Sequence, residues 1–123
     1  MDDTRDFKAR EIVCLEYQAT RLYAEMIQVV DSRQVGWIRP LLLAEFFASD
    51  LQSESPLLYD VRPSADVLWP LTLIRPVLDT EVMPLLLQLL VSDPPLDRDP
   101  DAFTRLYQFI CQAWQADRER AEG

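Results

Sequence analysis

Residues 4–34 read TRDFKAREIVCLEYQATRLYAEMIQVVDSRQ, and this stretch decides which fold class the sequence predicts. It contains neither proline nor glycine, and Asp3 or Thr4 offers a side chain of the kind that caps helix N-termini. With successive residues about 100° apart, one face collects apolar side chains three and four residues apart: Ile12, Leu15, Ala19, Leu22, Tyr23, Met26, Val29 and Val30. The pattern predicts one long amphipathic helix over residues 4–34.

The opposite side of this predicted helix is also partly apolar. Val13, Tyr17, Ala24 and Ile27 form a second, thinner stripe along it. A helix with two apolar faces lies either in the middle of a fold or against another chain. In a chain of 123 residues the second arrangement is favoured, so we expect Val13 and Tyr17 to contact a protein partner or the second subunit of a homodimer.

The middle of the chain, residues 35–78, is predicted to be interrupted by proline. Six of the nine prolines fall between residues 35 and 84, which disfavours long helices there. Residues 36–43 and 57–62 have extended character and predict a short antiparallel hairpin with residues 49–56 in its loop. Pro40 confines the first strand to an edge or a bulge. The alternative is a helix over residues 40–50 that begins at Pro40.

Two helices are predicted in the last third. Asp79 or Thr80 caps a helix over residues 79–91, whose nearly continuous apolar run indicates burial. Asp99-Pro100-Asp101 is a typical helix start and predicts a helix over residues 100–120. Its expected buried stripe is Phe103, Leu106, Tyr107, Ile110 and Trp114. The whole chain, residues 1–123, is therefore predicted as a single α-rich domain of the mainly α (α+β) class.

Composition excludes several kinds of site. The chain has no histidine and two cysteines, which excludes a Ser-His-Asp triad, a histidine-ligated metal and a Cys₄ site. Its two glycines, Gly36 and Gly123, cannot form a glycine-rich phosphate loop. Its net charge of −9 disfavours nucleic acid as a partner. We expect no cofactor and no metal.

The same composition suggests where the protein works. The longest apolar stretch, residues 82–91, is too short to cross a bilayer, so no transmembrane segment is predicted. The charged N-terminus lacks the apolar core of a signal peptide. Cys14 and Cys111 are most simply reduced thiols. These features predict a cytoplasmic location.

A tripeptide of an aliphatic residue, arginine and proline occurs three times, around Arg39, Arg62 and Arg75. A residue before proline is driven to extended geometry, which holds the guanidinium away from the backbone. Together with Trp37 and Trp69, these arginines are predicted to bind an acidic or aromatic partner surface through bidentate and stacking contacts. The alternative is that each arginine pairs with an acid of the same chain, such as those at positions 60, 66 or 79.

These features favour a noncatalytic protein–protein interaction protein, an assembly or regulatory accessory factor. We assign no catalytic residue. One alternative is a small lyase or isomerase, which needs an arginine and at least two of four carboxylates in one deep pocket: Asp60, Asp66, Asp79 and Glu81. Another is a small-ligand sensor with an apolar pocket under Trp37 and Trp69.

Several segments resemble a group of short cyanobacterial proteins of unassigned function. The resemblance covers residues 12–115, and the segments that carry it are residues 15–23, 37–41, 58–62, 68–70 and 75–86. It implies a cytoplasmic setting in a photosynthetic bacterium. Residues 17–22, YQATRL, are also similar to a helix of the small dimeric Rubisco-assembly chaperone, an analogy limited to those six residues.

Overall fold

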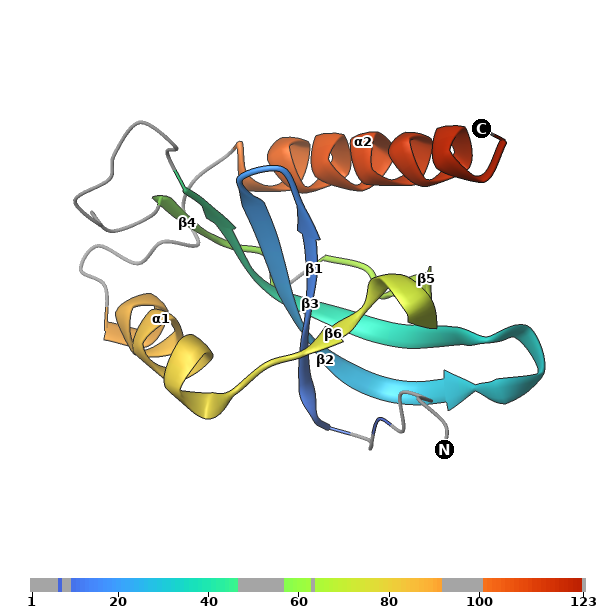
Figure 1. The fold of residues 1–123 in the computed structure, drawn as a ribbon. Coiled ribbons are helices and arrows are strands. Elements are labelled where there is room, and N and C mark those ends of the chain that lie inside the picture. The colour runs from blue at the N-terminus through green and yellow to red at the C-terminus, as the bar shows by residue number, and fades with distance from the viewer. Residues whose placement is uncertain (1–6, 8–9, 47–56, 63, 92–100, 123) are drawn as a thin grey trace.

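The computed structural model describes residues 7, 10–46, 57–62, 64–91 and 101–122. Within them the chain forms a strongly bent six-stranded antiparallel sheet with one α-helix on each side (Figure 1). The strands are β1 (Ile12–Tyr17), β2 (Thr20–Val30), β3 (Val35–Glu45), β4 (Leu57–Asp60), β5 (Val67–Pro70) and β6 (Arg75–Pro76). The helices are α1 (Asp79–Val91) and α2 (Ala102–Glu122), and short 3₁₀ turns occupy Asp31–Arg33 and Leu71–Leu73.

The predicted N-terminal helix over residues 4–34 is wrong. Its described part forms the β1–β2 hairpin, in which successive side chains point to opposite faces of the sheet. Leu15 and Leu22 belong to the core under α2, whereas Cys14 and Tyr23 belong to the core under α1. Because both faces are covered, the strands are apolar on both sides, and this double pattern imitated two stripes of a helix. The fold is α+β with a large antiparallel sheet, so the mainly α, α-rich interpretation is also wrong.

The turn between β1 and β2 gave no signal in the sequence. Tyr17 pairs with Thr20, so Gln18 and Ala19 form a two-residue hairpin loop. Gln18 has a positive φ of 55°, and Gln34, at the end of the β2–β3 connection, has a φ of 56°. Glycine or asparagine usually marks such positions. Neither residue occurs at these turns, so nothing in the sequence interrupted the predicted helix.

The sheet has the order β4-β3-β2-β1-β6, and β5 pairs with the N-terminal half of β3. The predicted antiparallel pairing of the Pro-rich middle is present in part: β4 pairs with β3 from Leu42↔Asp60 to Glu45↔Leu57, but inside the six-stranded sheet and not as a separate short hairpin. Pro40 lies at a shift in the β2–β3 register, where a residue without an N–H costs no regular hydrogen bond. The alternative helix over 40–50 is wrong for residues 40–45, and the predicted loop, 49–56, lies outside the described residues.

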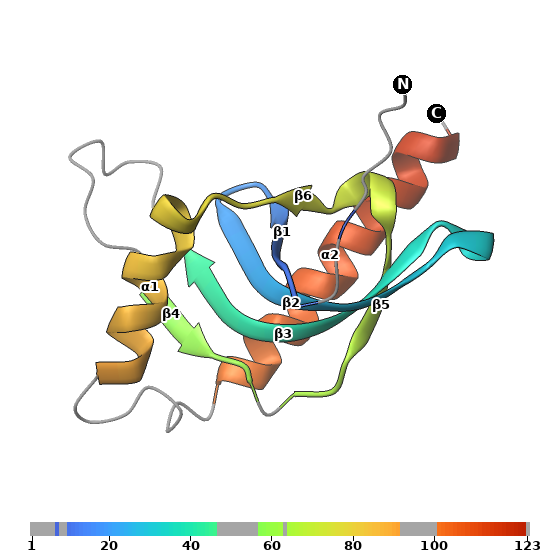
Figure 2. The same ribbon diagram turned by 90° about the horizontal axis from the view of Figure 1, so that it is seen from below.

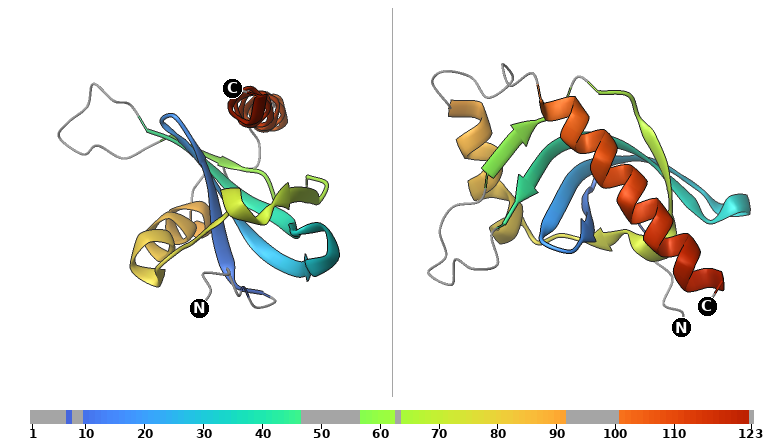
Figure 3. Two further views of the ribbon diagram at one scale, coloured as in Figure 1. Left: turned by 45° about the vertical axis from the view of Figure 1, so that its right-hand side comes forward. Right: turned by 90° about the horizontal axis from the view of Figure 1, so that it is seen from above.

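The two predicted C-terminal helices are confirmed, α1 with the predicted bounds and α2 shifted by two residues. Figure 3 shows the sheet between them, with α2 crossing one face, and Figure 2 shows α1 beside β4 on the other. Val82 and Leu85 of α1 pack on Tyr23 in one core, and Leu106 and Phe109 of α2 close the other. No helix in the described part of the chain is long and apolar enough to cross a membrane.

Candidate interaction surfaces

Val13 and Tyr17, the predicted contacts with a partner or second subunit, lie in β1. Val13 is fully buried in the core beneath α2, and Tyr17 is half-buried and packs against the same core. Val13 is therefore unavailable to another chain. The inference of a homodimer from an outward apolar stripe on a long helix has no basis in this fold.

Arg62 is paired with a buried acid at the end of β4. Its Nη2 lies 2.7 Å from Oδ2 of Asp60, and its Nε donates to Oδ1 at 2.9 Å. Burial raises the pKa of Asp60, but the hydrogen bonds from the Arg62 side chain and backbone more than offset it, so the pKa is lowered. The guanidinium is only half-exposed, and its flat donor edge is occupied within the chain.

Trp37 and Arg39 lie side by side on β3 and share one acid. Trp37 Nε1 donates to Oδ2 of Asp66 at 2.8 Å, and Arg39 Nε donates to Oδ1 at 3.2 Å. The hydrogen bonds from Trp37 and then Arg39 lower the pKa of Asp66. Leu68, paired with Trp37 across β3 and β5, adds an exposed apolar side chain to this small surface.

Trp69 does not join Trp37. It pairs with Gly36 and lies in the core on the α2 side, almost fully buried. Its ring meets that of Trp114 edge-on with the centroids 5.7 Å apart. The two tryptophans of the predicted surface therefore lie on opposite faces of the sheet, and no described pocket is lined by both.

Arg75 belongs to an ionic network that ties α1 to the sheet. It bonds both oxygens of Glu81, at 3.2 and 2.8 Å, and its Nε lies 3.3 Å from Glu16. Arg21 also pairs with Glu81, at 3.3 Å, and Tyr23 donates its hydroxyl to Glu81 at 2.8 Å. The hydrogen bonds from Arg75, with those from its neighbours, lower the pKa of Glu81, and burial raises the pKa of Tyr23 to about 12.

The three arginines of the repeated tripeptide therefore each bond an acid of the same chain. Arg39 and Arg62 use Asp66 and Asp60, two of the acids that the sequence offered, whereas Arg75 uses Glu81 and Glu16. Of the predicted surface, the structure brings together only Trp37 and Arg39. The sequence named Asp60 and Asp66 as candidate partners, but it could not show that Arg39 pairs with Asp66, 27 residues away, or Arg75 with Glu16, 59 residues away.

We predict that Arg62→Ala lowers the free energy of unfolding by about 1–3 kcal/mol, because it leaves the buried Asp60 carboxylate with one backbone donor from position 62. Arg39→Ala should change stability little, since its pair is solvent-screened. Urea denaturation of the two variants measures the loss in free energy of unfolding for each. Equal losses, or a larger loss for Arg39→Ala, would show that burial of Asp60 does not set the difference.

The pKa shifts predict a stability plateau bounded by acid and base. Carboxylates whose folded pKa is lowered (Asp60, Asp66 and Glu81) stabilise the fold above the unfolded value of about 4, and this is lost as the pH falls through the folded values. Cys14 and Tyr23, both raised to about 12 chiefly by burial, stabilise the fold until the pH rises above about 9. Without histidine, stability should be flat between about pH 5.5 and 8.

Urea midpoints measured from pH 3 to 11 test this profile. A sharp maximum of the urea midpoint near pH 7 would contradict the predicted plateau, because the chain has no histidine to titrate in that range.

Helix α1 presents a row of uncharged apolar side chains to solvent. We call Met83, Leu87 and Leu90, together with Leu78 just before the helix, the α1 face; Leu78, Met83, Leu87 and Leu90 are 74, 48, 53 and 64 % exposed. Residues 82–91 contain no charged side chain at all. The sequence predicted burial of this helix, which is correct for Val82 and Leu85 and wrong for the α1 face. An exposed apolar surface of this kind is a candidate interaction site.

A second apolar surface is a groove of about 430 Å³ between α2 and the chain that leads into β5. We call it the α2 groove; its lining residues are Ser64, Ala65, Asp66, Val67, Phe103, Leu106, Tyr107 and Ile110. The sequence predicted that Phe103, Tyr107 and Trp114 would be buried, but all three are exposed, and Phe109 takes the central buried position. The apolar part of α2 is therefore wider than the face that the sheet covers.

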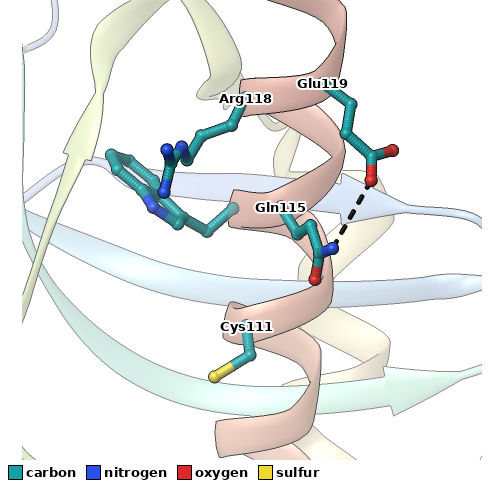
Figure 4. Close-up of a pocket in the computed structure, with 5 residues that line it drawn as sticks. Cys111, Gln115, Arg118 and Glu119 are labelled. Carbon is teal, nitrogen blue, oxygen red and sulfur yellow. Dashed lines mark hydrogen bonds between the residues drawn. The ribbon is translucent and has the colours of Figure 1, made fainter.

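A third hollow lies on the C-terminal half of α2, and its described lining comes from that helix alone (Figure 4). Gln115 donates to Glu119 at 3.4 Å along the helix, whereas the Arg118 side chain points away from this pair. Cys111 is an exposed free thiol there, whereas Cys14 is a buried one. Nothing in this polar helix surface is arranged as a reaction centre.

The carboxylates of the enzyme alternative do not converge. Asp60, Asp66 and Glu81 each bond a different arginine, and Asp79 lies exposed at the start of α1. The described residues contain no group of three His, Cys, Asp or Glu side chains that could hold a metal ion. Comparisons of the chain with protein-family models, curated proteins and solved structures gave no match.

Proposed function

We propose that this chain is a noncatalytic interaction protein, an assembly or regulatory accessory factor, and that it binds another protein through the α1 face. The observation that carries the proposal is the exposure of Met83, Leu87 and Leu90 on the charge-free segment 82–91 of α1, together with that of Leu78 just before the helix. The ionic network around Glu81 supports it, because it fixes the first turn of α1 on the sheet and so presents the face as a rigid surface.

The size of the α1 face indicates what the partner must supply. Complete burial of a leucine or methionine side chain stabilises by roughly 1.5–3 kcal/mol, so half-exposed side chains contribute about 1 kcal/mol each. Four of them give about 4 kcal/mol, near the low end of the 4–15 kcal/mol or so that association costs. The partner must therefore also contact the surface around α1, and the apolar row serves as the centre of a larger interface.

Charge favours a different protein over a second copy of this chain. Each copy carries a net charge of −9, so two copies in contact would bring like charges together around the apolar centre. Sedimentation velocity across a range of protein concentrations decides between them, with a monomer expected for the isolated chain. If the chain is a dimer and the double variant Leu87→Glu and Leu90→Glu is a monomer, the α1 face binds a second copy.

The proposal is tested by affinity capture from the cells that produce the protein, with quantitative mass spectrometry. The bait is the wild-type chain, a variant with Leu87→Glu and Leu90→Glu, or a control with Gln28→Glu and Thr72→Glu, two exposed positions outside the α1 face that add the same charge. We expect a protein that wild type and control enrich and that the α1 variant loses. Identical sets of captured proteins for all three baits would refute the proposal.

A further inference from the structure

We propose that the α2 groove binds an extended peptide segment with apolar side chains at alternate positions and at least one lysine or arginine. This inference rests on the proposed function and names the chemistry of a partner segment at a second surface. Five of the groove's side chains are distinctly apolar or aromatic, and they come from two separate elements: Val67 from β5 and Phe103, Leu106, Tyr107 and Ile110 from α2. A hollow between two elements offers a ligand more contact than a flat surface does.

The strand wall explains why the ligand is extended. β5 pairs with β3 along one side, and among the described residues no strand pairs with its other side. A strand edge of this kind presents backbone N–H and C=O groups to an incoming extended chain. Residues 64–67 line the groove, so a peptide lying in it runs along the chain that enters β5. A helical ligand could not use these backbone groups.

The helix wall explains the alternation. Phe103, Tyr107 and Ile110 follow one another along α2, and successive helix turns lie about 5.4 Å apart. Alternate residues of an extended peptide are about 6.6 Å apart and point to the same side. Every second side chain of the peptide can therefore enter a gap between the α2 side chains, while the intervening ones face solvent.

Charge complementarity selects a basic segment. The charged residue in the described lining of the groove is Asp66, whose two carboxylate oxygens accept one hydrogen bond each, from Trp37 and Arg39, so that Arg39 already balances part of its charge. The exposed Asp101 precedes the first turn of α2 near Phe103, and the whole chain is negative at −9. A lysine or arginine on the peptide is attracted to this surface, whereas an acidic peptide is repelled.

The test uses a phage-displayed library of random linear dodecapeptides, and selected sequences are resynthesised with a fluorescent label for anisotropy titration. The groove variant carries Phe103→Glu and Tyr107→Glu, both at exposed positions, and the matched control carries Gln28→Glu and Thr72→Glu, two exposed positions outside the α2 groove and the α1 face. Thermal melting confirms that both variants fold. We expect basic peptides with alternating apolar residues, an at least tenfold loss of affinity in the groove variant and no change in the control.

Hydrogen exchange of the wild-type chain with the selected peptide adds a second readout, and amides of residues 64–67, which line the groove, should exchange more slowly in the complex. Selection of no peptide, of acidic peptides, or of peptides that bind both variants equally would overturn the inference. The two proposals fail separately. A cellular partner that the α1 variant loses and the groove variant retains, without peptide binding, leaves the proposed function standing and refutes the groove. If basic peptides bind the groove but no cellular partner depends on the α1 face, the groove inference stands and the proposed function is refuted.

Discussion

Tyr23→Ala is expected to lower the free energy of unfolding by about 3–5 kcal/mol. Tyr23 is fully buried between the sheet and α1, in the core that also holds Cys14, Leu42 and Val82. Removal of the ring leaves a cavity on the side of the sheet that α1 covers, and it also removes the 2.8 Å hydrogen bond to Glu81. Urea denaturation followed by circular dichroism measures the loss.

Tyr23→Phe separates the two contributions. It keeps the ring in the core and deletes the hydroxyl, while Glu81 retains its bonds from Arg75 and Arg21. This variant should lose only about 1 kcal/mol. If Tyr23→Ala were as stable as Tyr23→Phe, the core under α1 would not hold the helix on the sheet.

The second large effect concerns binding. The double substitution Leu87→Glu and Leu90→Glu should weaken binding of the captured partner at least tenfold, because it places two charges at the centre of an apolar interface. The same change should alter the free energy of unfolding by no more than about 0.5 kcal/mol, since both side chains already face solvent. Isothermal titration with the purified partner and urea denaturation of the free chain measure the two quantities.

Measuring both binding and stability of the double variant separates loss of a binding surface from unfolding of the chain. If the double variant lost both stability and binding, Leu87 and Leu90 would contribute to the fold and not to a surface. If it lost neither, the α1 face would not be the binding site. Val82→Ala, a change at a fully buried position of the same helix, should show the opposite result, with stability reduced and the binding surface retained.

The sequence predicted the parts of this fold that carry local signals. Asp79 and the Asp-Pro-Asp motif that ends at Asp101 mark the starts of α1 and α2, and the β-rich run at 57–62 marks a strand that pairs with β3. The β1–β2 hairpin had no such signal. Its turn uses Gln18 in a left-handed conformation, and two covered faces removed the polar–apolar alternation that distinguishes a strand from a helix.

The candidate surfaces were predictable only in part. A run of ten residues without charge, 82–91, is visible in the sequence, but the sequence could not show which of its side chains the sheet leaves uncovered. The arginine before Pro40 was correctly placed beside Trp37 on an extended segment. Its acid, Asp66, lies 27 residues further along, and this pairing depends on β5 returning to β3.

The central claim is that the α1 face is covered by a partner protein, and Met83 reports on it directly. Met83 is half-exposed on that face, whereas Met26 is fully buried in the opposite core and serves as an internal reference. Hydroxyl-radical footprinting compares their oxidation in the isolated chain and in the complex captured from cells. We expect Met83 to oxidise several-fold more slowly in the complex, while Met26 stays unreactive in both. Equal oxidation of Met83 in the free chain and in the complex would contradict it.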